Sequence, residues 1–100
     1  MAYRDVTADE LRRRLDAGET LFLLDVREPE EVAEWAFPGA TNIPLGALAG
    51  RLDELPTDVP VVAICHAGIR SASAANALDA AGWTAENLAG GVIAWTERPA

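Results

Sequence analysis

The sequence is short of several residue types, and each shortage excludes a class of protein. It has one cysteine, so an internal disulfide framework is excluded. It has no lysine, and its eight arginines stand against 16 acidic residues, which gives a net charge of −8. This charge disfavours binding to nucleic acid or to an anionic membrane surface. No apolar run approaches the roughly 18 residues that a membrane-spanning helix needs.

The remaining composition indicates a small globular protein. With 100 residues, half of them hydrophobic, the chain is long enough for one core and too short for two, so we expect one domain over residues 1–100. Residues 1–5 do not begin a charged and then apolar leader, and a free thiol persists in a reducing compartment. We therefore expect a cytoplasmic protein whose partners are small molecules or other proteins. The oligomeric state stays open, and a monomer is compatible with the sequence.

Short apolar runs alternate with helical patterns along the chain, which is typical of a parallel sheet covered by helices on both faces. We predict the α/β class, with a central sheet of about five short strands. Four of the strands are expected at residues 21–24, 41–43, 61–64 and 86–88. The run Val-Val-Ala-Ile at 61–64 is the best candidate for the central strand.

Capping residues predict where the helices begin and end. Thr7 can cap a first helix that Gly18 ends, and Pro29 suits the first position of a short second helix. We interpret three acidic residues of that second helix as a solvated face rather than a site: Glu30, Glu31 and Glu34. Further helical segments are expected over residues 48–52, from near Ser71 to Gly82, and around Trp95.

Cys65 lies where the apolar run 61–64 ends and a helix of small residues begins, with Gly68 and Arg70 in the same turn. A strand that feeds a tight loop and then a helix leaves backbone N–H groups unpaired and directed at an anion. Such N–H groups and a guanidinium can raise the thiolate fraction of a thiol whose ordinary pKa is about 8.5. A lone cysteine after such a strand is also common as a small core residue.

Residues 65–71, Cys-His-Ala-Gly-Ile-Arg-Ser, resemble the active-site loop of rhodanese-type sulfurtransferases, in which a cysteine and an arginine bracket a glycine. Three more blocks resemble the same family in the same order, at residues 24–28, 37–44 and 90–95. Together the blocks cover roughly residues 21–98, which is more specific than any single motif. The resemblance implies a rhodanese-like fold and transfer of sulfane sulfur without a metal or an organic cofactor.

The resemblance also implies a role for each residue of the loop. Cys65 would be the nucleophile that carries the sulfur as a persulfide. Backbone N–H groups of the six following residues would bind that sulfur: His66, Ala67, Gly68, Ile69, Arg70 and Ser71. The donor would be thiosulfate, another small sulfur-containing anion or a persulfide, and the acceptor a thiol, cyanide or a protein.

Neighbouring residues would support the loop. Arg70 either adds fixed positive charge or pairs with a carboxylate such as Asp25 or Glu28, and both roles can coexist. Asp25 and Arg27 are interpreted as scaffold. Gly68 would relieve a positive φ within the loop. We expect His66 to line the entrance, and of the aromatic residues Trp35 and Phe37 are expected to come nearest to it.

Two features bear on competing functions. Four residues separate Cys65 from Arg70, whereas the related phosphatases and arsenate reductases have one more, so by resemblance the loop favours sulfur. The family's usual Gly-His-Ile is replaced by Trp-Ala-Phe at residues 35–37, which favours a weak thiosulfate enzyme whose donor is a protein persulfide. A noncatalytic binding or regulatory module is the main alternative, although the retained cysteine argues against it. A reductase would also need a second cysteine, which the chain lacks.

Overall fold

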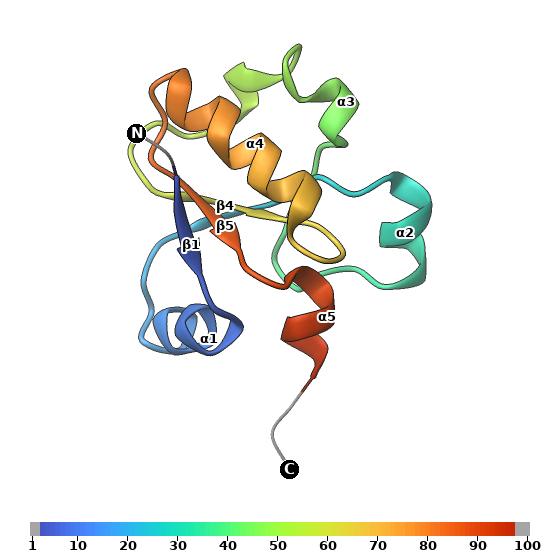
Figure 1. Ribbon diagram of the computed structural model, residues 1–100. Coiled ribbons are helices and arrows are strands. Elements are labelled where there is room, and N and C mark those ends of the chain that lie inside the picture. Colours follow the sequence, from blue (N-terminus) through green and yellow to red (C-terminus); the bar gives the residue numbers. More distant parts are fainter. Residues whose placement is uncertain (1–2, 98–100) are drawn as a thin grey trace.

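The computed structural model describes residues 3–97 and contains a five-stranded sheet in the order β1-β5-β4-β2-β3, with every neighbouring pair parallel. The strands are β1 Arg4–Val6, β2 Phe22–Asp25, β3 Thr41–Asn42, β4 Val61–Ile64 and β5 Ala85–Leu88. β4 lies at the centre, as predicted, and all four of its residues are buried (Figure 1). The α/β class and the parallel sheet are therefore confirmed.

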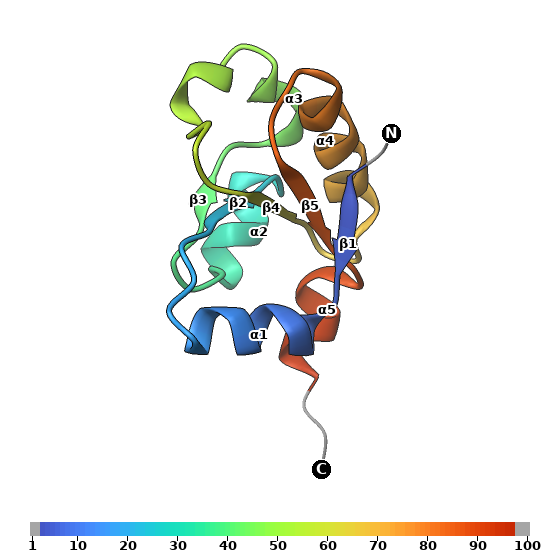
Figure 2. The same ribbon diagram turned by 90° about the vertical axis from the view of Figure 1, so that its left-hand side faces the viewer.

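Helices cover both faces of this sheet. In chain order they are α1 Ala8–Asp16, α2 Pro29–Glu34, α3 Leu45–Leu48, the 3-10 helix Leu52–Glu54, α4 Ile69–Ala80 and α5 Gly91–Thr96. α3 and α4 lie on one face, and α1 and α5 lie together on the other (Figures 1 and 2). α2 projects at the side of the sheet near the loop that follows β4 (Figure 1). Within residues 3–97, no helix is long and apolar enough to cross a membrane.

The core consists of two apolar layers because successive side chains of a strand point to opposite faces. Val61, Ala63 and Cys65 face α3 and α4, where they join Leu48 and Leu78. The alternate residues of the same strand face α1 and α5, together with residues of those helices: Val62, Ile64, Leu11 and Val92. Cys65 thus continues the alternation of β4, which directs its side chain under the N-terminus of α4.

The predicted helix ends agree with the structure. Thr7 Oγ1 accepts a hydrogen bond from Glu10 N, Gly18 has a φ of +81° just after α1, and Pro29 is the first residue of α2. The helix expected from Ser71 begins two residues earlier, at Ile69, because Gly68 rather than a side-chain cap precedes it.

Two predictions of local structure need correction. The structure has a strand at residues 4–6 that the sequence did not predict. This strand, β1, is a three-residue edge strand with two exposed positions, so it has no apolar run by which it could be recognised. The segment 48–52 is not one helical turn, since α3 ends at Leu48 and the 3-10 helix begins at Leu52.

Candidate active site

The carboxyl ends of β2, β4 and β5 meet at one edge of the sheet, where parallel α/β sheets bind ligands. Asp25 and Ile64 are paired across β2 and β4, so Cys65 emerges directly beside the end of β2. The loop after Cys65 turns at Gly68, whose φ is +94°, and continues as α4. This left-handed conformation is the one predicted for Gly68, and it favours glycine.

Gly68 and Ser71 donate hydrogen bonds to the sulfur of Cys65. Gly68 N lies 3.1 Å from Sγ, Ser71 N 3.3 Å and Ser71 Oγ 3.2 Å. Of the six loop residues that were predicted to bind sulfur through their amides, Gly68 and Ser71 therefore donate to it directly. The amides belong to the first turn of α4, where backbone N–H groups have no helical partner. The sulfur lies at the N-terminus of α4, which is where helices in general bind anions.

Burial and hydrogen bonding act on the thiol in opposite directions. Burial raises the pKa of Cys65, because the low-dielectric surroundings disfavour the thiolate. Hydrogen bonds from the Ser71 hydroxyl and from the N–H groups of Ser71, Gly68 and Ala67 favour the thiolate and outweigh burial. The net result is a pKa for Cys65 below the ordinary thiol value.

Cys65 is much less accessible than an open nucleophile, with 1% of its surface exposed. The loop closes over the sulfur because its donors must approach within about 3 Å to hydrogen-bond to it. The amides are bound to sulfur rather than to other groups. The thiol is therefore hydrogen-bonded by the loop and covered at the same time.

Arg70 forms a two-pronged ion pair with Glu31, at 2.7 Å and 2.9 Å. Arg70 thus pairs with a carboxylate, as expected, but the partner is Glu31 on α2 rather than Asp25 or Glu28, the two examples named from the sequence. Glu31 also accepts from the backbone N–H of Glu28 at 3.0 Å, which caps α2. The Arg70 guanidinium and this N–H lower the pKa of Glu31 to about 2. Glu31, interpreted from the sequence as part of a solvated face, thus belongs to the rim of the site.

Glu31 and, to a smaller extent, a charged Cys65 raise the pKa of Arg70 above its ordinary value. The direct partner of the guanidinium is Glu31. The Arg70 side chain is 37% exposed, so solvent screens much of this interaction. Of the two roles that the sequence left open for Arg70, the structure shows the pairing with a carboxylate.

Asp25 and Arg27 form a buried pair in the wall of the site. Arg27 Nη2 lies 2.7 Å from Asp25 Oδ2 and also donates to the carbonyl of Trp35 at 2.8 Å. Asn42 donates to the carbonyls of Asp25 and Arg27, at 2.9 Å each, which fixes the end of β2. Neither Asp25 nor Arg27 hydrogen-bonds to the sulfur, which is consistent with their interpretation as scaffold.

A hollow of about 270 Å³ opens beside the loop. Its walls include His66 and Trp35, together with Arg27, Glu31, Glu34 and Val92. His66 is exposed and lines this entrance, as expected. Phe37 was also expected near the mouth but is buried in the core, at 4% exposure, between the rings of Trp35 and Trp95.

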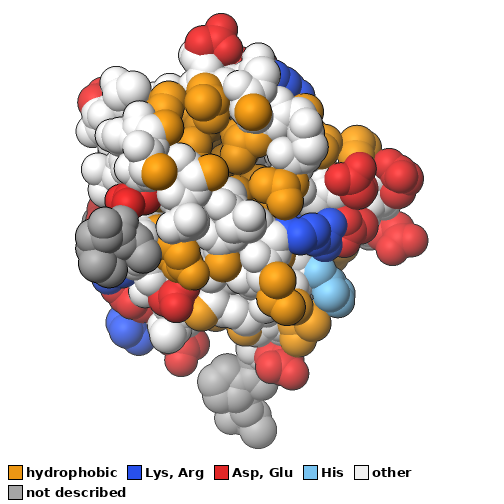
Figure 3. Space-filling view, turned by 45° about the horizontal axis from the view of Figure 1, so that its top comes forward, with side chains coloured by type: hydrophobic (Ala, Val, Ile, Leu, Met, Phe, Trp, Pro, Cys, Tyr) orange, Lys and Arg blue, Asp and Glu red, His pale blue; other side chains and the backbone are white. Residues whose placement is uncertain are grey.

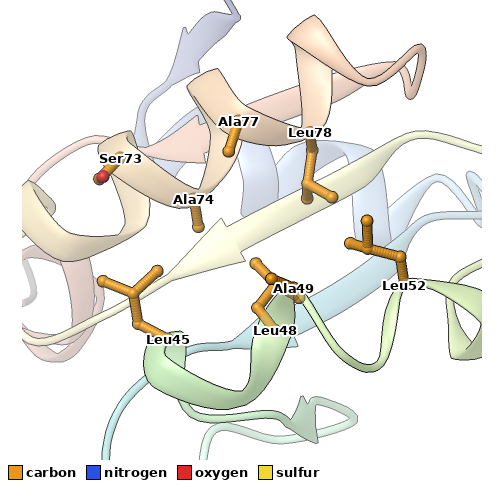
Figure 4. Close-up of a pocket in the computed structure, with 8 residues that line it drawn as sticks. All are labelled: Leu45, Leu48, Ala49, Leu52, Ser73, Ala74, Ala77 and Leu78. Atoms are coloured by element: carbon orange, nitrogen blue, oxygen red, sulfur yellow. The ribbon is translucent and has the colours of Figure 1, made fainter.

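Another hollow, of about 180 Å³, lies between α3 and α4 (Figure 4). Leucines from α3 and the 3-10 helix point into it from one side, and alanines and Leu78 of α4 face them. It has no titratable side chain among its lining residues. Ser73 supplies the one polar side chain among the lining residues.

Sequence reasoning missed a polar contact beneath the sulfur. Ser71 Oγ lies 2.6 Å from Asn87 Oδ1, and Asn87 Nδ2 donates to Asp5 Oδ1 at 3.0 Å and to the carbonyl of Gly68 at 3.3 Å. Asn87 is 4% exposed. A signal was present, because an asparagine within a buried strand that ends at the ligand-binding edge needs a polar partner.

The double glycine after β5 allows a close backbone approach to the loop. Val92 N donates to the carbonyl of Cys65 at 2.9 Å, and Ile93 N donates to that of His66 at 3.1 Å. A Cβ atom on Gly91 would lie 2.4 Å from the carbonyl oxygen of Cys65. Only glycine permits the N-terminus of α5 to hold the loop in this way.

The fold and the loop together define an α/β protein that holds a cysteine at a helix N-terminus, beyond its central parallel strand. Among such proteins, this chain belongs to the rhodanese-like domain family, whose family model matches residues 7–98. The family resemblance inferred from the four sequence blocks is confirmed.

Similar proteins agree with this family in both sequence and structure. A protein of Allochromatium vinosum named "Sulfurtransferase" is 36% identical over 92 residues, covering 91% of this chain and 86% of its own length. The human "Thiosulfate:glutathione sulfurtransferase" is 33% identical over 108 residues, covering 93% of each chain. The crystal structure of a rhodanese-like domain protein from Staphylococcus aureus has a TM-score of 0.89 at 32% identity, covering 95% of this chain and 93% of that one. The fold is rhodanese-like, and sulfurtransferases are among its relatives.

Proposed function

We propose that the protein is a sulfurtransferase that moves sulfane sulfur from a thiosulfate-like or persulfide donor to an acceptor through a Cys65 persulfide. The observation that supports this most is the contact of the Cys65 sulfur with Gly68 N, Ser71 N and Ser71 Oγ. These donors favour a thiolate and leave the nucleophile at the N-terminus of α4. We place the reaction in the reducing cytoplasm, where a free thiol persists.

The reaction has two nucleophilic steps. The Cys65 thiolate attacks the outer sulfur of the donor and a new S–S bond forms. The donor's own S–S bond breaks, and its electron pair leaves on sulfite or on the donor's thiolate. The outer sulfur remains on Cys65 as a persulfide anion. An acceptor thiolate or cyanide then attacks this outer sulfur, and Cys65 leaves as the thiolate. No external oxidant or reductant is needed.

The loop is suited to both steps. Its N–H groups stabilise the thiolate before attack and when Cys65 leaves, and one lost donor in such a site can reduce the rate about 10²–10³-fold. Arg70 adds positive charge next to an incoming anionic donor, with Glu31 fixing its direction. Asp25 and Arg27 hold the wall against which the loop is built.

By resemblance to the family, the four residues between Cys65 and Arg70 favour a single sulfur over a tetrahedral oxyanion. Within residues 3–97, the amides that reach Sγ leave little room around it, as its 1% exposure indicates. A phosphatase or arsenate reductase activity is therefore disfavoured. The same 1% exposure favours a second candidate function, a noncatalytic binding module in which Cys65 is only a core residue.

A turnover assay separates these candidates. The purified protein is incubated with thiosulfate or with glutathione persulfide and with cyanide, and thiocyanate is measured beside hydrolysis of an aryl phosphate. We expect thiocyanate formation that Cys65→Ser abolishes, and no phosphate release. A wild-type protein that is no faster than Cys65→Ser with either donor would support the binding module instead.

A further inference from the structure

The large hydrophobic side chains that are exposed within residues 3–97 come from segments next to the loop that follows Cys65. They are Trp35, Ile69 and Ile93, which are 37%, 78% and 41% exposed. Single exposed hydrophobic residues are ordinary, but a group around one site marks an interaction surface. We refer to these three residues as the apolar rim.

The backbone fixes each part of the apolar rim to the loop. Ile69 directly follows Gly68, and Ile93 N donates to the carbonyl of His66 at 3.1 Å. Trp35 lines the same hollow as His66. Figure 3 shows hydrophobic side chains beside the pale-blue histidine at this part of the surface. The apolar rim is therefore a fixed surface next to the reactive sulfur.

One side of the apolar rim is strongly acidic. α2 carries Glu30, Glu31 and Glu34, and a group of red acidic side chains projects next to the histidine in Figure 3. Arg70 is engaged by Glu31, whereas Glu30 and Glu34 have no arginine partner in the part of the chain that the structure describes. This side of the loop therefore favours a cationic group on a partner.

We propose that the apolar rim and α2 dock a protein partner that presents its reactive cysteine on a protruding segment, with apolar residues beside the cysteine and Lys or Arg beyond them. This proposal rests on the proposed function and names the class of its sulfur-exchanging partner. The partner's sulfur must protrude because Cys65 is 1% exposed. Apolar residues of the segment cover the rim, and its cations approach the carboxylates of α2. A small dianion such as thiosulfate has neither an apolar group for the rim nor a cation for the carboxylates of α2.

Peptide binding tests the docking without the sulfur chemistry. The Cys65→Ser protein is titrated against two fluorescent peptides with the same central Leu-Ser-Leu, one flanked by lysines and the other by glutamates. We expect the lysine peptide to bind about tenfold tighter than the glutamate peptide, with the difference shrinking as salt is raised. Equal affinity for the two peptides would overturn the proposal.

Variants outside the sulfur site locate the surface. Glu30→Lys, on α2, and Ile93→Ser, on the apolar rim, should each weaken binding of the lysine peptide several-fold, since one removes attraction and the other buried apolar area. Asp58→Lys is the matched charge control, because Asp58 precedes β4 and so lies toward the opposite edge of the sheet. An effect of Asp58→Lys as large as that of Glu30→Lys would contradict the assignment.

A second copy of the chain is a different occupant that the same variants detect. Sedimentation of the wild type over a range of concentrations should give a monomer, and a dimer that Ile93→Ser dissolves would overturn docking of a basic partner. Because these measurements do not use the thiol, failure of peptide binding would leave the transfer reaction intact. Absence of turnover with intact peptide binding would reject the sulfurtransferase function instead.

Discussion

The hydroxyl of Ser71 lies 2.6 Å from the side-chain carbonyl of Asn87, so Asn87 and Cys65 share one hydroxyl group. Asn87 is fixed in this orientation because its amide nitrogen donates to Asp5 and to the carbonyl of Gly68. The hydroxyl has a single proton. It can donate to Asn87 while Cys65 is a neutral thiol that donates to it, and it must turn to sulfur when Cys65 becomes a thiolate. Asn87 thus opposes the thiolate that Ser71 stabilises.

This relationship predicts opposite effects for two substitutions. Ser71→Ala removes a donor and should raise the pKa of Cys65, whereas Asn87→Leu frees the hydroxyl for sulfur and should lower it further. The ultraviolet absorbance of the thiolate as a function of pH measures both. Asn87→Leu should also cost about 1–3 kcal/mol of stability, because the buried partners of Asn87 lose their hydrogen bonds. A rise of the Cys65 pKa in Asn87→Leu would refute the shared-proton account.

Ser71→Ala should also slow the proposed transfer reaction about 10²-fold or more, as expected for the loss of a donor to the reacting atom. Ser73→Ala is the matched control, because Ser73 lies on the same helix but is exposed. The rates of sulfur transfer to cyanide are compared at one pH. Equal rates for the two variants would show that the Ser71 hydroxyl takes no part in transfer.

Glu31→Gln should change stability only at pH values where Glu31 is charged in the native state. The pKa of Glu31 is lowered from 4.5 to about 2 by Arg70 and by the backbone N–H of Glu28. A lowered native pKa stabilises the fold fully above pH 4.5, and this contribution is lost as the pH falls toward about 2. Because the pair is partly exposed, the loss in unfolding free energy should be at most about 1 kcal/mol. Denaturant unfolding of both proteins at neutral and acid pH measures it, and a difference that grows toward acid pH would contradict the assignment.

Gly68→Ala and Gly82→Ala separate backbone strain from close approach. Both glycines have positive φ, of +94° and +104°, so alanine should cost about 1–2 kcal/mol at either position. A Cβ atom at Gly68 would in addition lie 2.9 Å from the backbone nitrogen of Gly90, whereas nothing lies within 4 Å at Gly82. We expect Gly68→Ala to displace the loop and reduce sulfur transfer, and Gly82→Ala to retain it. Full activity of a folded Gly68→Ala protein would mean that the loop geometry is not needed.

The sequence allowed the strands and helices with strong local signals to be predicted. The apolar run of β4, the cap at Thr7 and the glycine of the active loop each depend on neighbouring residues, so they could be recognised without the fold. β1 could not, because a short edge strand with exposed residues has no such local pattern.

Side-chain partners across the sheet edge were harder to predict than the elements themselves. Glu31 binds Arg70, 39 residues away along the chain, and Asn87 on β5 contacts Ser71 on α4. Each pairing depends on the angle at which two helices or strands meet, which sequence spacing does not fix. The coverage of Cys65 was missed for the same reason, since it results from the loop, α4 and α5 together.

Mass spectrometry of the native chain after incubation with thiosulfate or a persulfide donor tests the central claim most directly. The proposed function predicts a gain of one sulfur atom on the peptide that contains Cys65, its loss on addition of cyanide, and no gain in Cys65→Ser. An unchanged mass for the folded wild-type protein with every donor would contradict the account, and Cys65 would then be a buried residue of a binding module.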